Sequence, residues 1–192
     1  MRAATAPPLT RNQEARRRRV VDAAMELAAV GGYDAVQMRD VAATARVALG
    51  TIYRYFSSKD HLLAAALVQW SDELQRRLSL RPSRAEEPVE RLVHVIRQAT
   101  RAMEREPKLA AALVTAISAP DPAVSSCQAE VTVIMVDLLT APMHGVDPEL
   151  RLGIVRVLSH VWFSSLVGWV NGWSTGGQVG DELEAAARLL LR

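Results

Sequence analysis

Apolar residues recur every three or four positions along most of this chain, which is the spacing of helices that bury one face. No stretch alternates apolar and polar residues as a half-buried strand would, so we predict an all-α fold. Glycine and proline residues set the expected ends of the helices. The predicted helices span about 13–30, two short segments within 38–59, and then 59–79, 88–105, 107–118, 123–140, 148–173 and 180–191.

The segment 38–59 has the most informative pattern. In its second helix, Ile52 and Phe56 lie four residues apart, so both point back into a small core. Its first helix has an apolar face that consists of Val41, Ala42 and Ala45. The other face of the second helix is largely polar and consists of Leu49, Gly50, Tyr53 and Arg54, with Thr51 and Tyr55 at its edges.

Such a face suits close approach to a phosphate backbone and to base edges in a major groove. We therefore predict a helix-turn-helix whose recognition helix is 49–55. The alternative is that Tyr53, Tyr55 and Phe56 are ordinary core aromatics of a helical bundle, which fits Phe56 better than the two tyrosines.

Several short motifs here resemble the DNA-binding signature of the TetR family of transcriptional regulators. They are Gly32-Tyr33, Val41-Ala42, Val47, the run from Gly50 to Phe56, and Ser58-Lys59. The resemblance implies a three-helix DNA-binding head at 1–58, and a six-helix body at 59–192 for effector binding and dimerisation. The residues expected to contact a double-stranded DNA operator are Arg39, Leu49, Gly50, Thr51, Tyr53, Arg54, Tyr55 and Lys59.

The distribution of charge agrees with a DNA-binding head. Residues 1–60 carry ten Lys and Arg against six Asp and Glu, whereas residues 61–192 carry thirteen against fifteen. A basic first third is the electrostatic footprint expected for nucleic acid. Arg11 and Arg16–Arg19 could add phosphate contacts from a flexible arm at 1–12, and Lys59 stands at a helix N-terminus that could clamp a phosphate.

The uncharged stretch Val157–Gly180 favours a homodimer. It contains His160 and other polar residues, so it is a poor membrane-spanning helix and instead requires a protein partner. One predicted face is bulky and consists of Leu158, Trp162, Ser165, Leu166, Trp169 and Trp173. The other face is small and consists of Val161, Ser164, Gly168 and Gly172. Regulators similar to this chain dimerise through their last two helices, so two heads would read a pseudo-palindromic operator.

The body is expected to hold a large apolar effector pocket, with no carboxylate or histidine in its wall. The predicted lining residues are Trp70, Leu74, Leu92, Ile96, Met103, Leu113, Ile117, Met135, Leu138, Leu139, Trp162, Leu166 and Trp169. Each of these residues is also compatible with plain core. Arg97, Arg101 and Arg105 form one stripe, which is either a solvated face or an anchor, through Arg97 and Arg101, for the phosphates of coenzyme A.

Within the family, the head resembles repressors of cholesterol catabolism that are released by coenzyme A thioesters of steroid catabolites. A regulator of efflux or of fatty-acid metabolism with another hydrophobic ligand fits the same fold, and a lipid-binding protein would explain only the body. We expect no enzyme, cofactor or metal site, because no nucleophile–base pair, phosphate loop or ligand cluster can be assembled. A single cysteine, Cys127, and the lack of a signal-peptide pattern indicate the cytoplasm.

Overall fold

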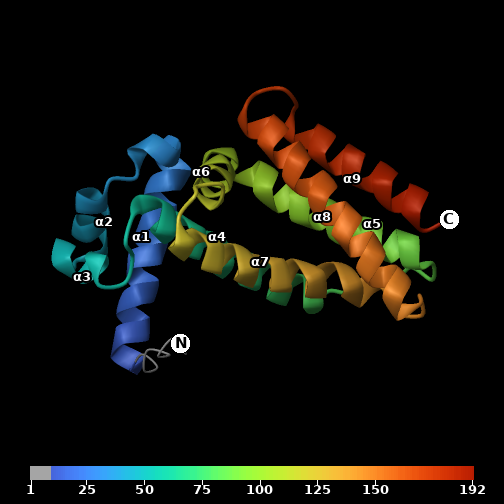
Figure 1. The fold of residues 1–192 in the computed structure, drawn as a ribbon, viewed down its shortest axis with the longest axis horizontal. Coiled ribbons are helices and arrows are strands. Elements are labelled where there is room, and N and C mark those ends of the chain that lie inside the picture. Colours follow the sequence, from blue (N-terminus) through green and yellow to red (C-terminus); the bar gives the residue numbers. More distant parts are fainter. Residues whose placement is uncertain (1–9) are drawn as a thin grey trace.

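The computed structural model describes residues 10–192, and these residues form nine α-helices, one short 3-10 helix and no strand (Figure 1). The predicted all-α fold is therefore confirmed. The helices are α1 Arg11–Ala35, α2 Met38–Ala45, α3 Leu49–Tyr53, α4 Lys59–Ser79, α5 Pro88–Arg105, α6 Pro107–Ile117, α7 Pro122–Thr140, η1 Ala141–Met143, α8 Pro148–Val170 and α9 Gly176–Leu190. The first nine residues of the expected arm lie outside the described part.

Local chemistry explains most helix ends. Proline occupies the first turn of α5, α6, α7 and α8, where its missing N–H is not needed. Ser58 caps α4 by accepting a hydrogen bond from the His61 N–H at 3.0 Å. Gly32, with φ of +74°, interrupts the regular geometry of α1 at the predicted stop, although helical turns resume as far as Ala35.

The last two helices differ from their predicted bounds. Helix α8 ends at Val170, because Gly172 adopts φ of +75° in the following turn. Helix α9 begins at Gly176, four residues earlier than expected, because Thr175 and Gln178 form a reciprocal capping box. Residues 171–173, predicted as helix, therefore lie in the connection, and residues 176–179, predicted as connection, belong to α9.

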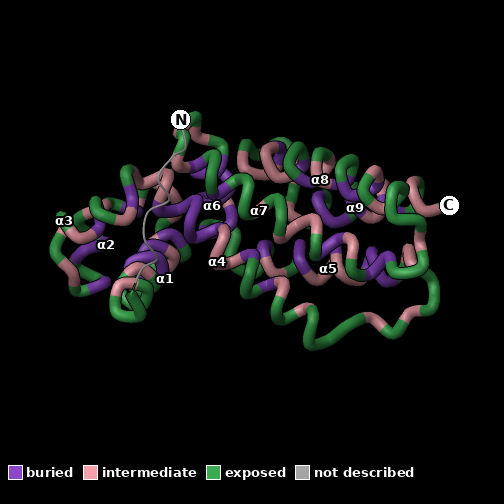
Figure 2. The backbone as a smooth tube through the Cα atoms, turned by 60° about the horizontal axis from the view of Figure 1, so that its bottom comes forward, coloured by how far each residue is buried: buried purple, intermediate pink, exposed green. Residues whose placement is uncertain are grey.

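Helix α6 lies between the two ends of the molecule. Helices α1 to α3 form one end, drawn in blue and cyan in Figure 1, while α5, α8 and α9 form the other. Helix α4 runs between the two ends with α7 along its length, and α6 packs on both α1 and α4. Figure 2 shows buried residues where α1, α4 and α6 meet, whereas the tip formed by α2 and α3 is mainly exposed.

The buried residues form two large clusters and one small one. The first cluster joins Ile52 and Phe56 of the helix-turn-helix to residues of α1, α4, α6 and α7. The second joins α5, α8 and α9 to the far part of α4. The third contains Met103, Ala110 and Val114, and lies against side chains of α4 and α8. The end formed by α1 to α3 thus shares a continuous buried cluster with α4, α6 and α7.

A buried arginine joins two loops at the far end of the body. Arg91 is 7% exposed and donates to the carbonyl oxygens of Pro142 at 2.8 Å and His144 at 3.0 Å. It also donates to those of Ala85, at 3.3 Å, and Glu86. The rigid fork of the guanidinium matches four main-chain acceptors at once, so Arg91 fixes the loop before α5 against the one after α7.

Candidate nucleic-acid interface and effector site

A left-handed residue sets the angle between α2 and α3. Arg46 has φ of 55° and ψ of 50°, and the Val47 N–H then donates to the Ala42 carbonyl oxygen at 3.0 Å. This conformation is uncommon for a residue with a side chain and costs roughly 1 kcal/mol. The sequence carries no signal for this role of Arg46, because arginine has no preference for the left-handed conformation.

Helix α3 has the buried and exposed faces that its sequence predicts. Ile52 and Phe56 are fully buried, whereas Tyr53 is 54% exposed. Gly50 is exposed, and a side chain at this position would meet no other part of the protein. Helix α3 is shorter than predicted and ends at Tyr53, with the two following residues in a turn.

The remaining residues predicted to contact DNA differ in exposure. Arg39 on α2 and Arg54 are exposed, while the half-buried residues are Leu49, Thr51, Tyr55 and Lys59. Within the basic run of α1, the Arg17 guanidinium lies 5.2 Å from the centre of the Phe56 ring, so it supports the core from outside. Arg16, Arg18 and Arg19 are exposed.

The Lys59 side chain lies against the protein itself. Its Nζ is 3.7 Å from the centre of the Tyr33 ring and donates to the Tyr33 carbonyl oxygen at 3.3 Å. The Tyr33 hydroxyl donates to Asp60 Oδ1 at 2.6 Å. Burial, followed by this hydrogen bond, raises the pKa of Tyr33 to about 12. The structure thus holds the Lys59 cation over an aromatic ring, with N–H groups left for a further acceptor such as a phosphate.

Three further polar contacts tie the head to the body. Lys108 Nζ donates to the Val30 carbonyl oxygen at 2.9 Å, which joins the start of α6 to α1. Ser58 Oγ donates to Asp121 Oδ2 at 3.3 Å, and Gln69 Nε2 donates to Asp22 Oδ1 at 2.7 Å. These contacts join α4 to the start of α7 and to α1.

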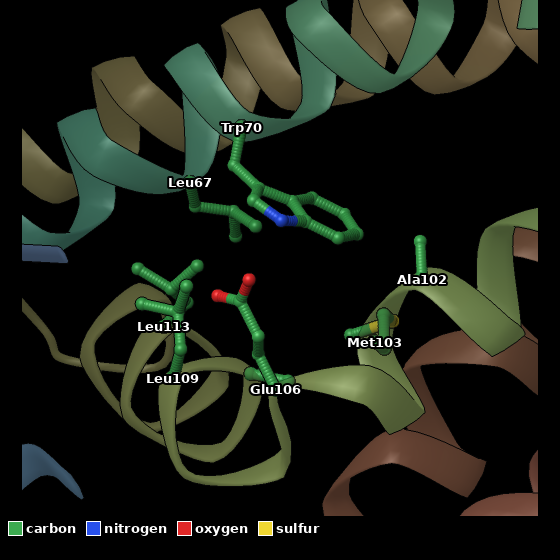
Figure 3. A pocket seen from close by; sticks show the side chains of 8 residues that line it. Leu67, Trp70, Ala102, Met103, Glu106, Leu109 and Leu113 are labelled. Atoms are coloured by element: carbon green, nitrogen blue, oxygen red, sulfur yellow. The ribbon is translucent and has the colours of Figure 1, made fainter. Parts of the chain in front are cut away.

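Two small pockets lie on either side of Met103. The first, of about 10 Å³, lies among α4, α5 and α6 (Figure 3). Its lining residues are Leu67, Trp70, Ala102, Met103, Glu106, Leu109, Ala110 and Leu113. The second, also of about 10 Å³, lies among α5, α8 and α9. Its lining residues are Thr100, Met103, Glu104, Leu166, Trp169, Gly176 and Val179.

The pockets contain five of the predicted lining residues, namely Trp70, Met103, Leu113, Leu166 and Trp169. The others lie elsewhere in the packed interior. Leu74, Leu92, Ile96, Leu139 and Trp162 belong to the second buried cluster, with Met135 against it. Ile117 belongs to the first cluster, and Leu138 is also buried. Large apolar side chains at helical spacing identify the core, and cannot by themselves identify a pocket within it.

The expectation of a pocket without a carboxylate is wrong. Glu106 lines the first pocket, and Figure 3 shows its carboxylate pointing toward Leu67 and Trp70. It is the N-cap residue of α6, yet its side chain makes no capping hydrogen bond. Glu104 lines the second pocket. The sequence did place Glu106 between the helices predicted at 88–105 and 107–118, and both of these helices line the first pocket.

Arg97, one member of the candidate anionic anchor, already has partners within the chain. Arg97 pairs with Asp181 at 2.8 Å and with Glu184 at 2.6 Å, both on α9. Two carboxylates already neutralise this guanidinium, so a phosphate would have to displace them. Gly180 permits the approach, since a side chain there would lie 3.1 Å from Arg97 Nη1. Arg101, the other member of the predicted anchor, is exposed.

Helix α8 has its predicted bulky side turned inward, with Leu158, Trp162 and Ser165 buried. Its exposed large apolar side chains are Leu150, Leu152, Val157 and Phe163. Of the predicted small face, Ser164 is exposed and Val161 half-buried. The other two positions are corrected, because Gly168 is buried against Ser174, whose Oγ would lie 3.4 Å from an added Cβ, and Gly172 follows the helix end.

Two segments are long and apolar enough to cross a membrane by length and composition alone, namely Pro122–Met143 and Pro148–Val170. In the most apolar window of each, only 22% and 28% of the residues are buried within the chain. Core helices of proteins in water pass the same test. The low burial nevertheless means that much of the apolar surface of α8 is not covered by its own chain.

Two family models match this chain. "Bacterial regulatory proteins, tetR family" matches residues 20–66, and "Tetracyclin repressor-like, C-terminal domain" matches residues 85–190. The HTH-type transcriptional repressor KstR of Rhodococcus jostii is 41% identical over 180 residues, which cover 93% of this chain and 84% of that protein. KstR of Mycobacterium tuberculosis is 37% identical over 180 residues, with coverage of 93% and 82%.

Solved structures give the same result. A TetR transcriptional regulator from Rhodococcus sp. RHA1 has a TM-score of 0.77 and 32% identity, with 94% of this chain and 97% of that chain covered. FadR of Thermus thermophilus, a TetR-family repressor solved with lauroyl-CoA, has a TM-score of 0.68 and 26% identity. The match covers 91% of this chain and 93% of the FadR chain.

Replacing Tyr33 by phenylalanine should lower the free energy of unfolding by about 0.5–1.5 kcal/mol at pH 8, because the hydrogen bond to Asp60 is lost. The folded-state pKa, about 12, is above the unfolded value of about 10. The stabilisation is therefore complete below about pH 10 and is lost as the pH rises toward 12. Urea unfolding of wild type and Tyr33→Phe at pH 8 and pH 11 measures the difference in their free energies of unfolding. Tyr53→Phe, at an exposed tyrosine, is the control. A difference between wild type and Tyr33→Phe that is the same at both pH values would contradict it.

Proposed function

The chain belongs to the TetR family of transcriptional regulators, and we propose that it is a cytoplasmic repressor that binds a pseudo-palindromic operator as a homodimer. In this proposal residues 1–58 read DNA, and residues 59–192 bind an effector and form the dimer. The effector is a large apolar molecule, a steroid-derived acyl-coenzyme A, whose binding releases the operator. The observation that carries the regulatory function is the polar, exposed face of α3 above a fully buried Ile52 and Phe56.

The reading surface is supported by exposure and by charge. Tyr53 and Arg54 are exposed on a helix that is anchored from below, and Gly50 beside them permits close approach of a backbone. Arg39 on α2 and the exposed arginines at 16, 18 and 19 supply further positive charge for phosphates. Lys59, fixed over Tyr33, would contribute its remaining N–H groups at the N-terminus of α4.

The double variant Tyr53→Ala, Arg54→Ala should bind operator more weakly by roughly 1–3 kcal/mol for each lost contact. The fold should persist, because neither side chain is buried. Fluorescence anisotropy at several salt concentrations, on a DNA fragment that the wild type selects from a random pool, measures affinity and salt slope. Arg77→Ala, an exposed arginine on α4, is the control for charge. Operator binding by the folded double variant at wild-type strength would exclude α3 as the reader.

The dimer is supported by the outward face of α8. Phe163 is 48% exposed and Val157 is 45% exposed, on a helix whose most apolar window is only 28% buried. Ser164, from the predicted dimer set, is exposed seven residues after Val157 and therefore lies on the same side of the helix, with the half-buried Val161 between them. A second copy of α8 and α9 would bury this surface and hold two heads at a fixed distance, as a symmetric operator requires.

A charge on the outward face of α8 should produce monomers. Phe163→Arg and Ser164→Arg each place a cation where a partner helix would exclude water, and an unpaired buried charge costs several kcal/mol. Leu80→Arg is the matched control, because Leu80 is 82% exposed at the end of α4. Sedimentation velocity distinguishes monomer from dimer for the wild type and each variant. Either a monomeric wild type or two unaffected variants would be incompatible with this interface.

The effector proposal rests on the apolar pockets and on the relatives. Both pockets are lined mainly by apolar residues of the body. A TetR-family relative of known structure was solved with lauroyl-CoA. The resemblance of the head to repressors of cholesterol catabolism implies a coenzyme A thioester of a steroid. Arg101 is the exposed candidate for the phosphates, now that Arg97 is paired. Regulation of efflux or fatty-acid metabolism by another apolar ligand is the second candidate, and the same lining favours it equally.

Steroid coenzyme A thioesters should release operator-bound protein, whereas the free steroid acids should not. Arg101→Ala should weaken release about tenfold, as expected when one charge-assisted contact to phosphate is lost. Anisotropy of labelled operator measures release, and Arg77→Ala again serves as the control. Release by a fatty acyl thioester or an unrelated drug alone would make the steroid assignment wrong while leaving the regulator in place.

A further inference from the structure

We propose that Met103 divides one effector cavity into two halves, and that a single elongated ligand with uncharged ends occupies both when this side chain moves aside. The inference rests on the proposed effector site but not on the identity of the effector. Met103 is the one residue that lines both pockets among the described residues, and it is only 6% exposed.

Met103 lies between the residues that line the first pocket and those that line the second. It forms a small buried cluster with Ala110 and Val114, and the side chains packed against this cluster are Trp70, Leu166, Trp169 and Val170. Trp70 reaches it from α4 in the first pocket (Figure 3), while Leu166 and Trp169 reach it from α8 in the second. One methionine therefore separates two tryptophans that line different pockets.

The size of the two pockets means that a ligand requires side chains to move. In the described conformation each pocket encloses about 10 Å³, which is room for about one water molecule. Binding sites for drug-sized ligands enclose about 300–1,000 Å³. Met103 lines both pockets, so its displacement is the one that would join them. Methionine suits the position, because its unbranched side chain adopts several shapes at low cost and contacts aromatic rings favourably.

The charges at the pockets restrict the ligand. Glu106 lines the first pocket and Glu104 the second, and both residues are exposed. A carboxylate at each pocket repels an anionic group there and accepts a hydrogen bond from a hydroxyl. The part of the ligand inside the cavity is therefore an apolar body with neutral ends, and any phosphate or carboxylate of the ligand lies outside.

The test uses Nile red, a neutral molecule of four fused rings that fluoresces in apolar sites, and the full-length protein without DNA. Wild type should bind one molecule per protomer, Met103→Ala at least fivefold more tightly, and Met103→Trp at least tenfold more weakly. Met143→Ala is the matched control, because Met143 is fully buried in the second cluster and lines neither pocket. Its affinity should stay within twofold of wild type.

A second pair of variants tests whether one molecule spans both halves. Trp70→Ala and Trp169→Ala each remove a wall of one pocket, and both should weaken binding at least fivefold with the stoichiometry unchanged. Circular dichroism and urea unfolding identify any variant that fails to fold, in which case the remaining variants decide.

Three results would overturn the inference. They are a Met103→Ala affinity no higher than that of Met143→Ala, an effect of only one tryptophan, and no binding to either wild type or Met103→Ala. None of these measurements involves operator release. The expected Nile red pattern together with steroid thioesters that fail to release DNA would leave the cavity standing and make the proposed effector wrong.

Discussion

The apolar cluster that joins the helix-turn-helix to α4 and α6 is the constraint on which the rest of the structure depends. A five-residue helix such as α3 has no stability of its own in water. Ile52 and Phe56 hold it in place only because α1, α4 and α6 supply the surface on which they pack. The orientation of the reading face is therefore a property of the body as well as of the head.

In the proposed mechanism, α6 would link the two ends, because its residues contact both the support of α3 and the first pocket. Leu109 and Leu113 belong to the cluster that supports α3, and both also line the first pocket. Protein interiors are as closely packed as organic crystals, so a ligand that moves these leucines also moves what lies behind them. Lys108 adds a polar tie from the start of α6 to the Val30 carbonyl oxygen of α1. A displacement of α6 therefore reaches the head through packing and through a hydrogen bond.

Local rules predicted the elements well, and tertiary contacts explain where they failed. Prolines and a serine cap identified the starts of α4 to α8, and four-residue spacing identified the buried face of α3. The early start of α9 was also readable, because Thr175 and Gln178 have capping-box spacing, but the intervening glycines suggested a loop. The pairing of Arg97 with α9 was not readable, since no local pattern shows which carboxylates 80 or so residues away will meet an arginine. The burial of Gly168 could not be read from the uncharged stretch 157–180, because no charged residue there marks the solvent-facing side.

The small size of the two pockets indicates that the described conformation binds an effector poorly. A ligand changes the balance between a DNA-binding and a released form only through its different affinity for the two. Shifting the balance from 1:99 to 99:1 requires about 5.5 kcal/mol of that difference. In the described conformation Met103 keeps either pocket too small for a drug-sized molecule, so such a ligand would bind this conformation poorly and an expanded one well. In the proposed mechanism, closed packing around Met103 would supply the difference in affinity. Helix α6, which forms a wall of the first pocket and a support of the head, would convert it into movement of the reading helices.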